Sequence, residues 1–289
     1  MGLNIFVSNR CFIYCKGCYS YSREERCNAV LSTKVIEKFL KYAYDYGIKK
    51  VTLCGGDPLA RNNIINLLEK VKDIGFSISI DTVGTPLLRD VSIGKKVIEQ
   101  VDAQKISKLV NFVGIPIDGS SNEIIRLFRP TRRDILGEQI AICNILNDNK
   151  VKVCINTVVH KGNVKDAKKM AKIIKEIGAY KWQLFQYAPL GKYGFINKEK
   201  FEISEKEFDK FKEDILKECS ESEIKIEFKK NRDRVKNYIL IDNSGNAWIP
   251  EFEKIITAEN PDSGRLIIGN IKHEDDWEKI CQYVKGQSK

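Results

Sequence analysis

The sequence predicts an α/β protein whose core is a mostly parallel β-sheet. In the first 190 of its 289 residues, short apolar segments alternate with segments of helical spacing, giving six βα units. Strands separated by helices of roughly 10–15 residues form βαβ crossovers, which make neighbouring strands parallel. The expected strands are apolar almost throughout, as strands covered on both faces are. Six units are fewer than the eight that close a barrel, so we expect an open doubly wound sheet or a partial barrel.

The first three units have clear start and stop signals. Ser32 is a good N-cap residue, and apolar residues then recur at helical spacing as far as Gly47. Gly75 follows the second helical segment and is typical of a helix C-terminus. The expected elements are a strand at 3–8, a helix at 32–47, a strand at 49–54, a helix at 64–74 and a strand at 76–82.

The next three units continue the alternation. The helical pattern at residues 93–107 is the least regular, whereas the helix that ends before Gly178 is well defined. The expected elements are a helix at about 93–107, a strand at 109–118, a helix at 134–147, a strand at 151–159, a helix at 164–177 and a strand at 181–190.

The character of the sequence changes after Leu190. A loop-like connection leads to a charged amphipathic helix at 205–219, then to short strand patterns (KIEFK, YILID and RLIIGNI) and a final helix in HEDDWEKICQYV. We therefore expect residues 1–190 to form one catalytic domain. Residues 191–289 are expected to form a small mixed α+β extension that caps it.

Composition narrows the class of protein. No window approaches 18 consecutive apolar residues, which predicts no membrane span, and the N-terminal MGLNIFVSNR does not resemble a signal peptide. Nine cysteines without such a signal favour a cytoplasmic location and thiolate ligands over disulfides. The net charge of +10 comes from dispersed lysines rather than from a basic patch with interleaved aromatics, so nucleic acid is not an expected partner.

Three cysteines in the loop after the first strand carry the strongest chemical signal. Cys11, Cys15 and Cys18 have the spacing C-x3-C-x2-C within CFIYCKGCYSY. Soft thiolates select iron–sulfur clusters or zinc. A zinc site normally completes four ligands, and His160 and His273 lie far along the chain. A four-iron cluster held by three cysteines has one iron without a protein ligand, which is able to bind an external molecule.

This motif resembles the defining motif of the radical S-adenosylmethionine (radical SAM) enzymes. The resemblance covers about residues 3–190 and implies a partial (βα)6 TIM-like barrel. It also implies two cofactors: a [4Fe–4S] cluster held by the three cysteines, and SAM chelated by the open iron. One electron from the cluster then splits SAM into methionine and a 5′-deoxyadenosyl radical, which removes hydrogen from a substrate. An electron donor such as a flavodoxin or ferredoxin is an implied partner.

The resemblance also identifies candidate SAM-binding residues. Gly55-Gly56-Asp57-Pro58 is similar to the family's Gly-Gly-Glu-Pro, whose backbone pairs with the SAM amino group, with Asp57 in place of Glu. An ordinary strand-end turn is the alternative interpretation. Thr82, which ends the third strand, is expected to face the same site.

Three further positions are similar to SAM contacts. Arg129 resembles an arginine that contacts SAM, with a solvated helix-end arginine as the alternative. Asn156 resembles a polar residue near the ribose or adenine, with a buried hydrogen-bonding Asn as the alternative. Many members place an aromatic before the third cysteine, where this sequence has Gly17, so Tyr19 or Tyr21 is expected to flank the adenine instead.

The C-terminal half is most similar to the viperin-like, nucleotide-dehydrating branch. The similarity lies in INTVV, WQLFQ, FEISEKEFDKF and YILID. Viperin-like enzymes use lysines near the fifth and sixth strands to bind a triphosphate, but the matching residues are Cys154 and Gln183. Lys152 and Lys181 are nearby, and we expect them on the opposite strand face because side-chain direction has a period of two.

Three functions remain open. The first is a radical SAM enzyme that acts on a nucleotide or another small anionic molecule. The second is a maturase that epimerises or crosslinks a ribosomally made peptide, with Cys219 or Cys281 as the hydrogen donor of an epimerase. The third is a non-enzymatic sensor that binds zinc or a cluster. The C-terminal region holds too few cysteines to predict an auxiliary cluster. Asp81, Asp118 and Tyr187 are further residues that are able to face a substrate.

Overall fold

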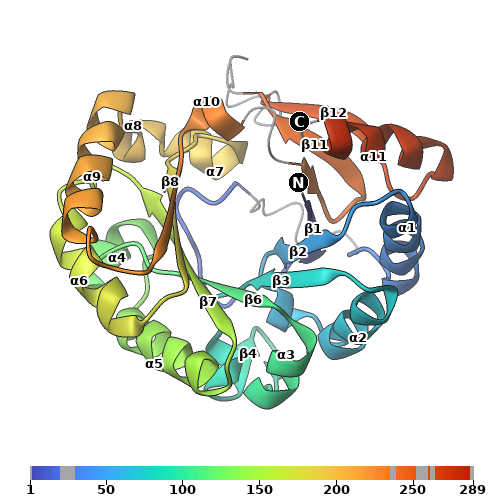
Figure 1. Ribbon diagram of the computed structural model, residues 1–289, viewed down its shortest axis with the longest axis horizontal. Helices are drawn as coiled ribbons and strands as arrows, with labels where there is room; N and C mark the ends of the chain where they lie inside the picture. Colours follow the sequence, from blue (N-terminus) through green and yellow to red (C-terminus); the bar gives the residue numbers. More distant parts are fainter. Residues whose placement is uncertain (1, 20–29, 235–238, 252–259, 261–263, 287–289) are drawn as a thin grey trace.

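The fold is built around one ten-stranded sheet (Figure 1). The computed structural model describes residues 2–19, 30–234, 239–251, 260 and 264–286. The strands are ordered β12-β11-β10-β1-β2-β3-β6-β7-β8-β9, and β9 and β12 do not pair with each other within these ranges. The sheet curls into an open barrel with helices around its outside (Figure 1).

Six central strands, supplied by the successive βα units, form a continuous parallel sheet. Each pairs with its neighbour in the parallel sense, as the sequence predicts for successive βα units. These strands are β1 (Leu3–Ser8), β2 (Lys50–Gly55), β3 (Ser77–Asp81), β6 (Phe112–Pro116), β7 (Lys152–Val159) and β8 (Lys181–Gln186). The predicted partial (βα)6 barrel is therefore confirmed.

The surrounding helices begin and end at residues with a local physical reason. Ser32 caps the first helix by accepting a hydrogen bond from the Val35 amide. Gly75 and Gly178 end two others in the left-handed conformation, with φ of 106° and 68°. The helices of the βα units are α1 (Thr33–Asp45), α2 (Ile64–Ile74), α3 (Ala103–Leu109), α4 (Asn122–Phe128), α5 (Ile135–Asp148) and α6 (Ala167–Ile177).

The prediction of a helix at residues 93–107 is partly wrong. Its first part is a hairpin of β4 (Val91–Ile93) and β5 (Lys96–Ile98), which turns at Gly94 with a φ of 61°. The helix starts only after Asp102, whose side chain accepts a hydrogen bond from the Gln104 amide. The connection expected to be a loop after Leu190 contains two short helices, α7 (Gly191–Ile196) and α8 (Lys198–Phe201).

The C-terminal residues extend both edges of the sheet. β9 (Lys225–Lys229) pairs in parallel with β8 at one edge. β10 (Ile239–Ile241) pairs in parallel with β1 at the other edge and is followed by antiparallel β11 (Asn246–Pro250) and β12 (Arg265–Asn270). The helices of this region are α9 (Glu205–Glu218), α10 (Asn231–Arg234) and α11 (Trp277–Gly286). None of the described helices is long and apolar enough to cross a membrane.

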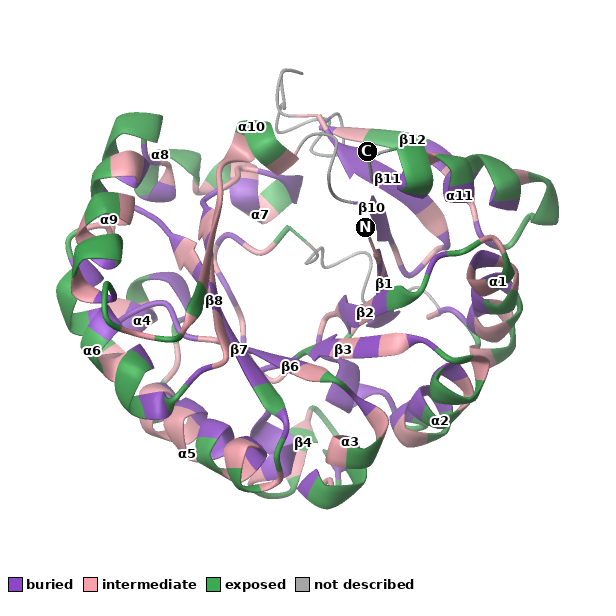
Figure 2. Ribbon diagram, viewed as in Figure 1, coloured by how far each residue is buried: buried purple, intermediate pink, exposed green. Residues whose placement is uncertain are grey.

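The two faces of the sheet have different roles. Residues such as Trp182 and Leu184 point outward into the main hydrophobic core, which fills the space between sheet and helices. The helices accordingly bury their inner sides and expose their outer sides (Figure 2). Lys181, Gln183 and Phe185 alternate with them and point into the barrel. The inward face therefore supplies the side chains of the candidate site.

Candidate active site

The three motif cysteines lie together in the loop that follows β1. Cys15 is buried, Cys11 and Cys18 are half-buried, and all three pack in a small apolar cluster with Phe128 and Tyr187. Burial raises the pKa of Cys11 well above its usual value, and charge on Asp57 or Cys15 raises it further. The three thiols are thus neighbours in space as well as in sequence.

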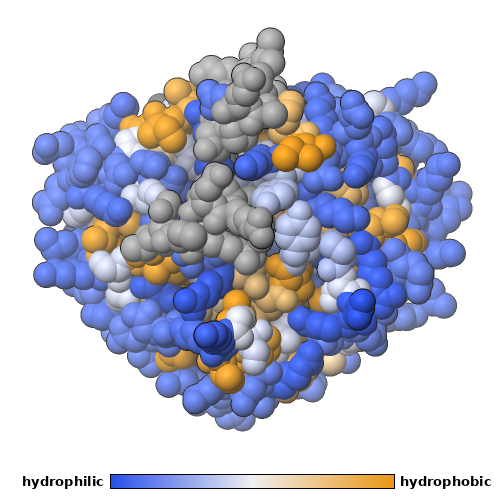
Figure 3. Space-filling model, turned by 180° about the vertical axis from the view of Figure 1, so that it is seen from behind, coloured by the Kyte–Doolittle hydropathy of each residue, from blue (hydrophilic) through white to orange (hydrophobic). Residues whose placement is uncertain are grey.

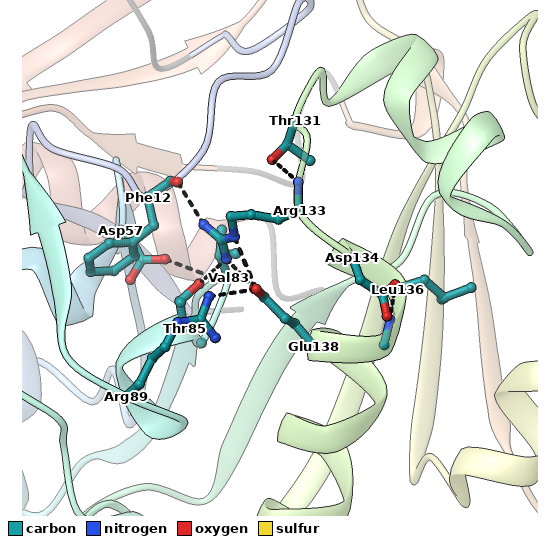
Figure 4. A network of polar contacts seen from close by, with 12 residues as sticks. Phe12, Asp57, Val83, Thr85, Arg89, Thr131, Arg133, Asp134, Leu136 and Glu138 are labelled. Carbon is teal, nitrogen blue, oxygen red and sulfur yellow. Dashed lines mark hydrogen bonds and ion pairs between the residues drawn. The ribbon is translucent and has the colours of Figure 1, made fainter.

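Contacts from three other segments hold this loop in place. The Lys16 amide donates to the Phe128 carbonyl (2.9 Å), and Asn197 donates from its side chain to the Lys16 carbonyl (2.8 Å). Arg133 donates to the Phe12 carbonyl (3.3 Å) and to Thr85 Oγ1 (2.8 Å) (Figure 4). The loop is therefore positioned by the end of α4, by Arg133 just before α5 and by Asn197, which lies between Ile196 and Lys198 after β8.

The glycines after β2 allow the backbone to approach the cysteine loop closely. Gly55 has a φ of +116°, which favours glycine, and a Cβ on Gly56 would lie 2.2 Å from the Arg10 carbonyl oxygen. The next amide, of Asp57, donates to that carbonyl (2.6 Å). Larger residues at these two positions would push the β2 turn away from the loop.

The Asp57 side chain supports the turn from inside. Its carboxylate accepts hydrogen bonds from Thr82 Oγ1 (2.7 Å), the Val83 amide (2.7 Å) and the Leu59 amide (2.9 Å). Burial raises the pKa of Asp57 to about 6, while these hydrogen bonds act in the opposite direction. Asp57 and Thr82 are both buried and bonded to each other, so their side chains join the ends of β2 and β3.

Arg129 links the cysteine loop to the barrel. It forms a buried ion pair with Asp118, and its Nη1 lies 2.9 Å from Cys15 Sγ. Burial lowers the pKa of Arg129, but Asp118 and Cys15 outweigh it and raise that pKa. Burial raises the pKa of Cys15 to about 12, and the charge of Arg129 opposes this increase. A solvated helix-end arginine is therefore the wrong interpretation.

The position before the third cysteine is glycine because two rings fill the space beside it. A Cβ on Gly17 would lie 2.5 Å from the Tyr187 ring and 2.7 Å from the Phe128 ring. Tyr187 donates its hydroxyl to the Gly194 carbonyl (2.6 Å), so its ring, and not its hydroxyl, is presented to the cavity. These rings come from α4 and from the segment after β8, far from the motif in sequence.

One cavity adjoins this group and continues into the barrel. Gly17, Phe128, Arg129, Val158 and Tyr187 line it next to the cysteine loop. Four inward-facing residues line it within the barrel, and we call them the lumen residues: Asn4, Cys54, Asp81 and Asn156. The C-terminal strands and α10 supply another wall, which we call the C-terminal wall: Arg234, Leu240, Trp248 and Pro250.

The side of the molecule opposite to the view in Figure 1 is mixed in polarity. Hydrophobic side chains are visible near the middle of this face, and hydrophilic side chains dominate its rim (Figure 3). Aromatic and aliphatic side chains with a few polar groups are the usual lining of a small-molecule site.

Among the polar residues at strand ends, only some face this cavity. Asn156 donates from Nδ2 to Asp81 Oδ1 (3.0 Å), and both residues line the cavity. Asp118 instead pairs with Arg129 and accepts a hydrogen bond from the Val158 amide (2.8 Å). Asp81 is thus the strand-end acid that a ligand is able to reach.

Tyr19 also lines the cavity, on the side of β1 and β11. It is 38% exposed, and its ring lies 6.2 Å from the ring of Phe6 and 6.5 Å from that of Trp248. Phe128 and Tyr187, not Tyr19, are the aromatics next to Gly17. Tyr21 lies outside the described residues.

The expectation about the two lysines is wrong, because Lys152 shares a face of β7 with Cys154 and Lys181 shares a face of β8 with Gln183. Lys181 Nζ and Gln183 Nε2 both reach the carboxylate of Glu227, at 2.7 Å and 2.8 Å, so they lie on the same face of β8. Residues two apart share a face, because the side-chain period of a strand is two. Lys229 also pairs with Glu227 (3.0 Å), so two lysines surround one glutamate and this group carries one net positive charge.

The cysteines named as hydrogen donors do not face the cavity. Cys219 and Cys281 belong to the main core between helices and sheet. Cys54 lines the cavity instead, because it lies on the inward face of β2. Period-two alternation within KKVTLC was the signal that could have identified it.

The donor set fits a cluster with an open position. The cysteine loop offers three thiols beside the cation of Arg129, and the cavity begins next to it. Among the described residues, no three Cys, His, Asp or Glu side chains converge as ligands of a single metal ion. Cysteines that hold a four-iron cluster bind different iron atoms and do not need to converge on one point.

Fold and site together define a partial-barrel protein whose three-cysteine loop lies at one end of a cavity of the kind that binds ligands. The chain belongs to the Radical SAM superfamily, whose family model matches residues 5–174. It is a radical SAM enzyme, so the non-enzymatic sensor is set aside. The family uses a [4Fe–4S] cluster and SAM, as predicted.

Relatives with named activities support this assignment. A probable GTP 3′,8-cyclase of Methanothermobacter marburgensis is 40% identical over 94 residues, which cover 32% of this chain and 30% of that protein. The corresponding protein of Methanocaldococcus jannaschii is 27% identical over 71% of this chain and 66% of its own length. An S-adenosylmethionine-dependent nucleotide dehydratase of Flammeovirga pacifica is 20% identical over 84% of this chain and 80% of its own length.

Solved structures share the fold. Streptococcus suis SuiB bound to S-adenosylmethionine has a TM-score of 0.67 at 18% identity, over 85% of this chain and 59% of SuiB. The anSMEcpe structure with bound AdoMet has a TM-score of 0.65 at 18% identity, over 99% of this chain and 84% of its own. At these identities the likeness establishes the architecture alone.

Proposed function

We propose that this enzyme uses SAM to abstract hydrogen from a nucleotide-like substrate that binds inside the barrel. The observation that carries the proposal is the single cavity that runs from Arg129 beside the cysteine loop to Asp81 and Asn156 on the inward strand faces. A [4Fe–4S] cluster with bound SAM supplies a 5′-deoxyadenosyl radical. The protein holds both molecules and excludes water.

The cysteine-loop end of the cavity would hold the cluster and SAM. Cys11, Cys15 and Cys18 are the proposed cluster ligands, and the exposed backbone of Gly55 and Gly56 is the proposed partner of the SAM amino group. Asp57 and Thr82 act by keeping that turn in position, because their side chains bind each other and nearby amides.

The remaining SAM contacts would come from the barrel strands and their ends. Arg129 would attract the SAM carboxylate while keeping Asp118 as its partner. Asn156 would lie near the ribose or adenine. The rings of Phe128 and Tyr187 are proposed to flank the adenine in place of Tyr19, since they occupy the space beside Gly17.

The substrate would occupy the part of the cavity between the lumen residues and the C-terminal wall. Arg234 would place a cation there, and Phe185 and Trp248 would offer surfaces for a ring. The curated relatives named above act on GTP or on nucleotides, and nucleotide dehydration is the activity of the viperin-like branch. On this proposal residues 1–190 bind SAM, and the cap at 191–289 completes the substrate site.

A peptide maturase is the second candidate. SuiB has been solved with its precursor peptide SuiA, and anSMEcpe with the Kp18Cys peptide, and both share this fold. In an epimerase, Cys54 would replace Cys219 and Cys281 as the thiol to examine, because it lines the cavity.

The proposed partners and location follow from the chemistry. A flavodoxin or ferredoxin would supply the electron, and a reducing compartment such as the cytoplasm would keep the thiols free. None of the eight cysteines among the described residues forms a disulfide. Nucleic acid is not a proposed partner, since the basic residues are dispersed along the chain.

The test is anaerobic turnover of the iron-reconstituted enzyme with SAM and dithionite. GTP, CTP, ATP and UTP are added singly, and 5′-deoxyadenosine is measured against the SAM-only background. We expect at least one nucleotide to raise the rate and to be converted. If none does, while a short peptide encoded beside the gene raises it, the maturase replaces the nucleotide enzyme.

A further inference from the structure

A glycine-dependent pair of polar side chains lies inside the barrel, away from the cysteine loop. Asn156 on β7 reaches across β6 to donate to Asp81 Oδ1 on β3 (3.0 Å). The β6 residue between them is Gly114, where a Cβ would lie 2.0 Å from Asp81 Oδ1 and 2.6 Å from Asn156 Nδ2. This pair therefore requires glycine at residue 114.

Asp81 has fewer hydrogen-bond and ion-pair partners than the other acids that face inward or are buried. Asp57 accepts three hydrogen bonds, Asp118 has Arg129, and Glu227 has two lysines and Gln183. Within the described part of the chain, Asp81 has one hydrogen bond and no cation. The Asp81 side chain is exposed to the cavity, so the hydrogen-bonding capacity that the protein leaves unused is open to a ligand.

The groups around Asp81 direct it toward a ligand. It is accessible from the cavity, and its charge acts on two neighbouring thiols, those of Cys54 and Cys154. Burial raises the pKa of both thiols, so they remain neutral and offer no charge to the carboxylate. The second oxygen of Asp81 is thus able to accept hydrogen bonds from a ligand.

The rest of the cavity has the character of a site for a flat ring. Phe185, Tyr19 and Trp248 contribute aromatic side chains to its lining. Trp248 Nε1 is buried and has no hydrogen-bond partner among the described residues. Proteins that bind extruded bases combine apolar or aromatic stacking with hydrogen bonds to the Watson–Crick edge. Carboxylates accept hydrogen bonds from exocyclic amino groups of bases.

We propose that Asp81, oriented by Asn156 over Gly114, recognises the amino-bearing edge of a nucleobase such as guanine or cytosine. Asp81 accepts hydrogen bonds from the exocyclic amino group, and the aromatic side chains cover the ring. This inference rests on the proposed nucleotide function and names the substrate feature that the site selects. Bases with a carbonyl or hydrogen at that position, as in uracil and hypoxanthine, leave Asp81 without its donor.

The experiment compares two matched pairs of probes, GTP with ITP and CTP with UTP. Binding to the iron-reconstituted enzyme with SAM is measured by calorimetry at neutral pH. We expect the amino-bearing member of at least one pair to bind about tenfold or more tightly than its partner. Asp81→Asn is expected to reduce that ratio to about twofold or less, whereas Asp73→Asn on the exposed side of α2 should keep it.

Each outcome decides the proposal. Equal affinity within both pairs, no binding by any of the four nucleotides, or an unchanged ratio in Asp81→Asn would overturn it. The affinity ratio within each nucleotide pair is measured in the unmodified enzyme, so this part of the test does not depend on whether a variant folds. Cluster absorption shows that each variant has folded. If discrimination is observed but no nucleotide is turned over, the recognition site stands and the proposed function fails. If a nucleotide is turned over but no discrimination is observed, the proposed function stands and the recognition site fails.

Discussion

The cysteine-loop end of the cavity and its lumen are built in different ways. At the cysteine loop, the two charged groups have protein partners: Arg129 has Asp118, and Asp57 has Thr82 and two backbone amides. In the lumen, Asp81 has a single partner in the described part of the chain. The first region is thus already organised for a fixed cofactor. The second leaves hydrogen-bonding capacity for a substrate.

The largest expected effect comes from removing a proposed cluster ligand. Cys11→Ala, Cys15→Ala and Cys18→Ala should each lose the visible absorption and most of the iron after reconstitution, because three thiolates are the minimum set for this site. Cys219→Ala is the matched control, since that thiol lies in the core outside the barrel. Normal iron content in Cys15→Ala would show that the cysteine loop is not the cluster site.

The second effect tests whether Arg129 organises this end of the cavity. Arg129→Met leaves the buried Asp118 carboxylate unpaired, which should lower the free energy of unfolding by about 3–5 kcal/mol. The double variant with Asp118→Asn should recover part of that loss. Urea unfolding of the cluster-free protein measures both.

A control for the Arg129 experiment is the exposed pair of Lys38 with Glu274. Lys38→Ala should cost less than about 1 kcal/mol, since both side chains are more than half exposed. An equal loss in Lys38→Ala and Arg129→Met would contradict the special role of the buried pair.

Two glycine substitutions compare the cysteine-loop end of the cavity with its lumen directly. Gly56→Ala places a Cβ 2.2 Å from a backbone carbonyl, so the turn must move, and we expect a loss of about 1–3 kcal/mol in stability and poorer cluster retention. Gly114→Ala meets the movable Asp81 side chain instead. It should keep the cluster while disturbing nucleotide discrimination.

Thermal unfolding, iron content and nucleotide binding distinguish the two glycine variants. Gly286→Ala, which has open space around it, is the control. Equal losses of cluster in Gly56→Ala and Gly114→Ala would show that the two regions are not separate. Such a result would place Asp81 in the support of the cysteine loop.

The smallest expected effect is a pH dependence of the free energy of unfolding that comes from Asp81 alone. Burial raises its pKa to about 6, with the Asn156 hydrogen bond opposing the increase. Asn156 is bonded to Asp81, the charge of Asp81 acts on the thiols of Cys54 and Cys154, and the charged groups around Cys154 are Lys181, Glu227 and Lys229. An unfolded aspartate has a pKa of about 3.9, so the folded protein binds an extra proton between these values.

The raised pKa of Asp81 adds to the free energy of unfolding at low pH. It is fully present below about pH 4 and is lost as the pH rises through about 6. The stability of the unmodified protein relative to Asp81→Asn should therefore decline over this interval, as measured by urea unfolding at a series of pH values. A constant difference would mean that folding does not raise the pKa of Asp81.

The same two regions explain how much could be predicted from the sequence. The cysteines, Gly55-Gly56 and the six βα units could be identified because each depends on short-range spacing and local propensity. The hairpin at residues 91–98 was missed, since two three-residue strands carry little periodic signal. Gly17 could be noticed but not explained, because the rings beside it come from residues 128 and 187.

The lumen could be predicted less well. The contact of Asp81 with Asn156 joins residues 75 positions apart and depends on Gly114 in a third strand. The C-terminal wall exists because β10 pairs in parallel with β1, which no local pattern specifies. Lys181 was placed on the wrong face, although its spacing from Gln183 was sufficient to place it correctly.

The most direct test of the central claim is formation of 5′-deoxyadenosine from SAM by the reconstituted enzyme under anaerobic, reducing conditions. We predict that the unmodified enzyme forms it, that a nucleotide accelerates it, and that Cys15→Ala forms none. Continued formation of 5′-deoxyadenosine by Cys15→Ala would contradict the account, as would its absence from an unmodified enzyme that carries a full cluster.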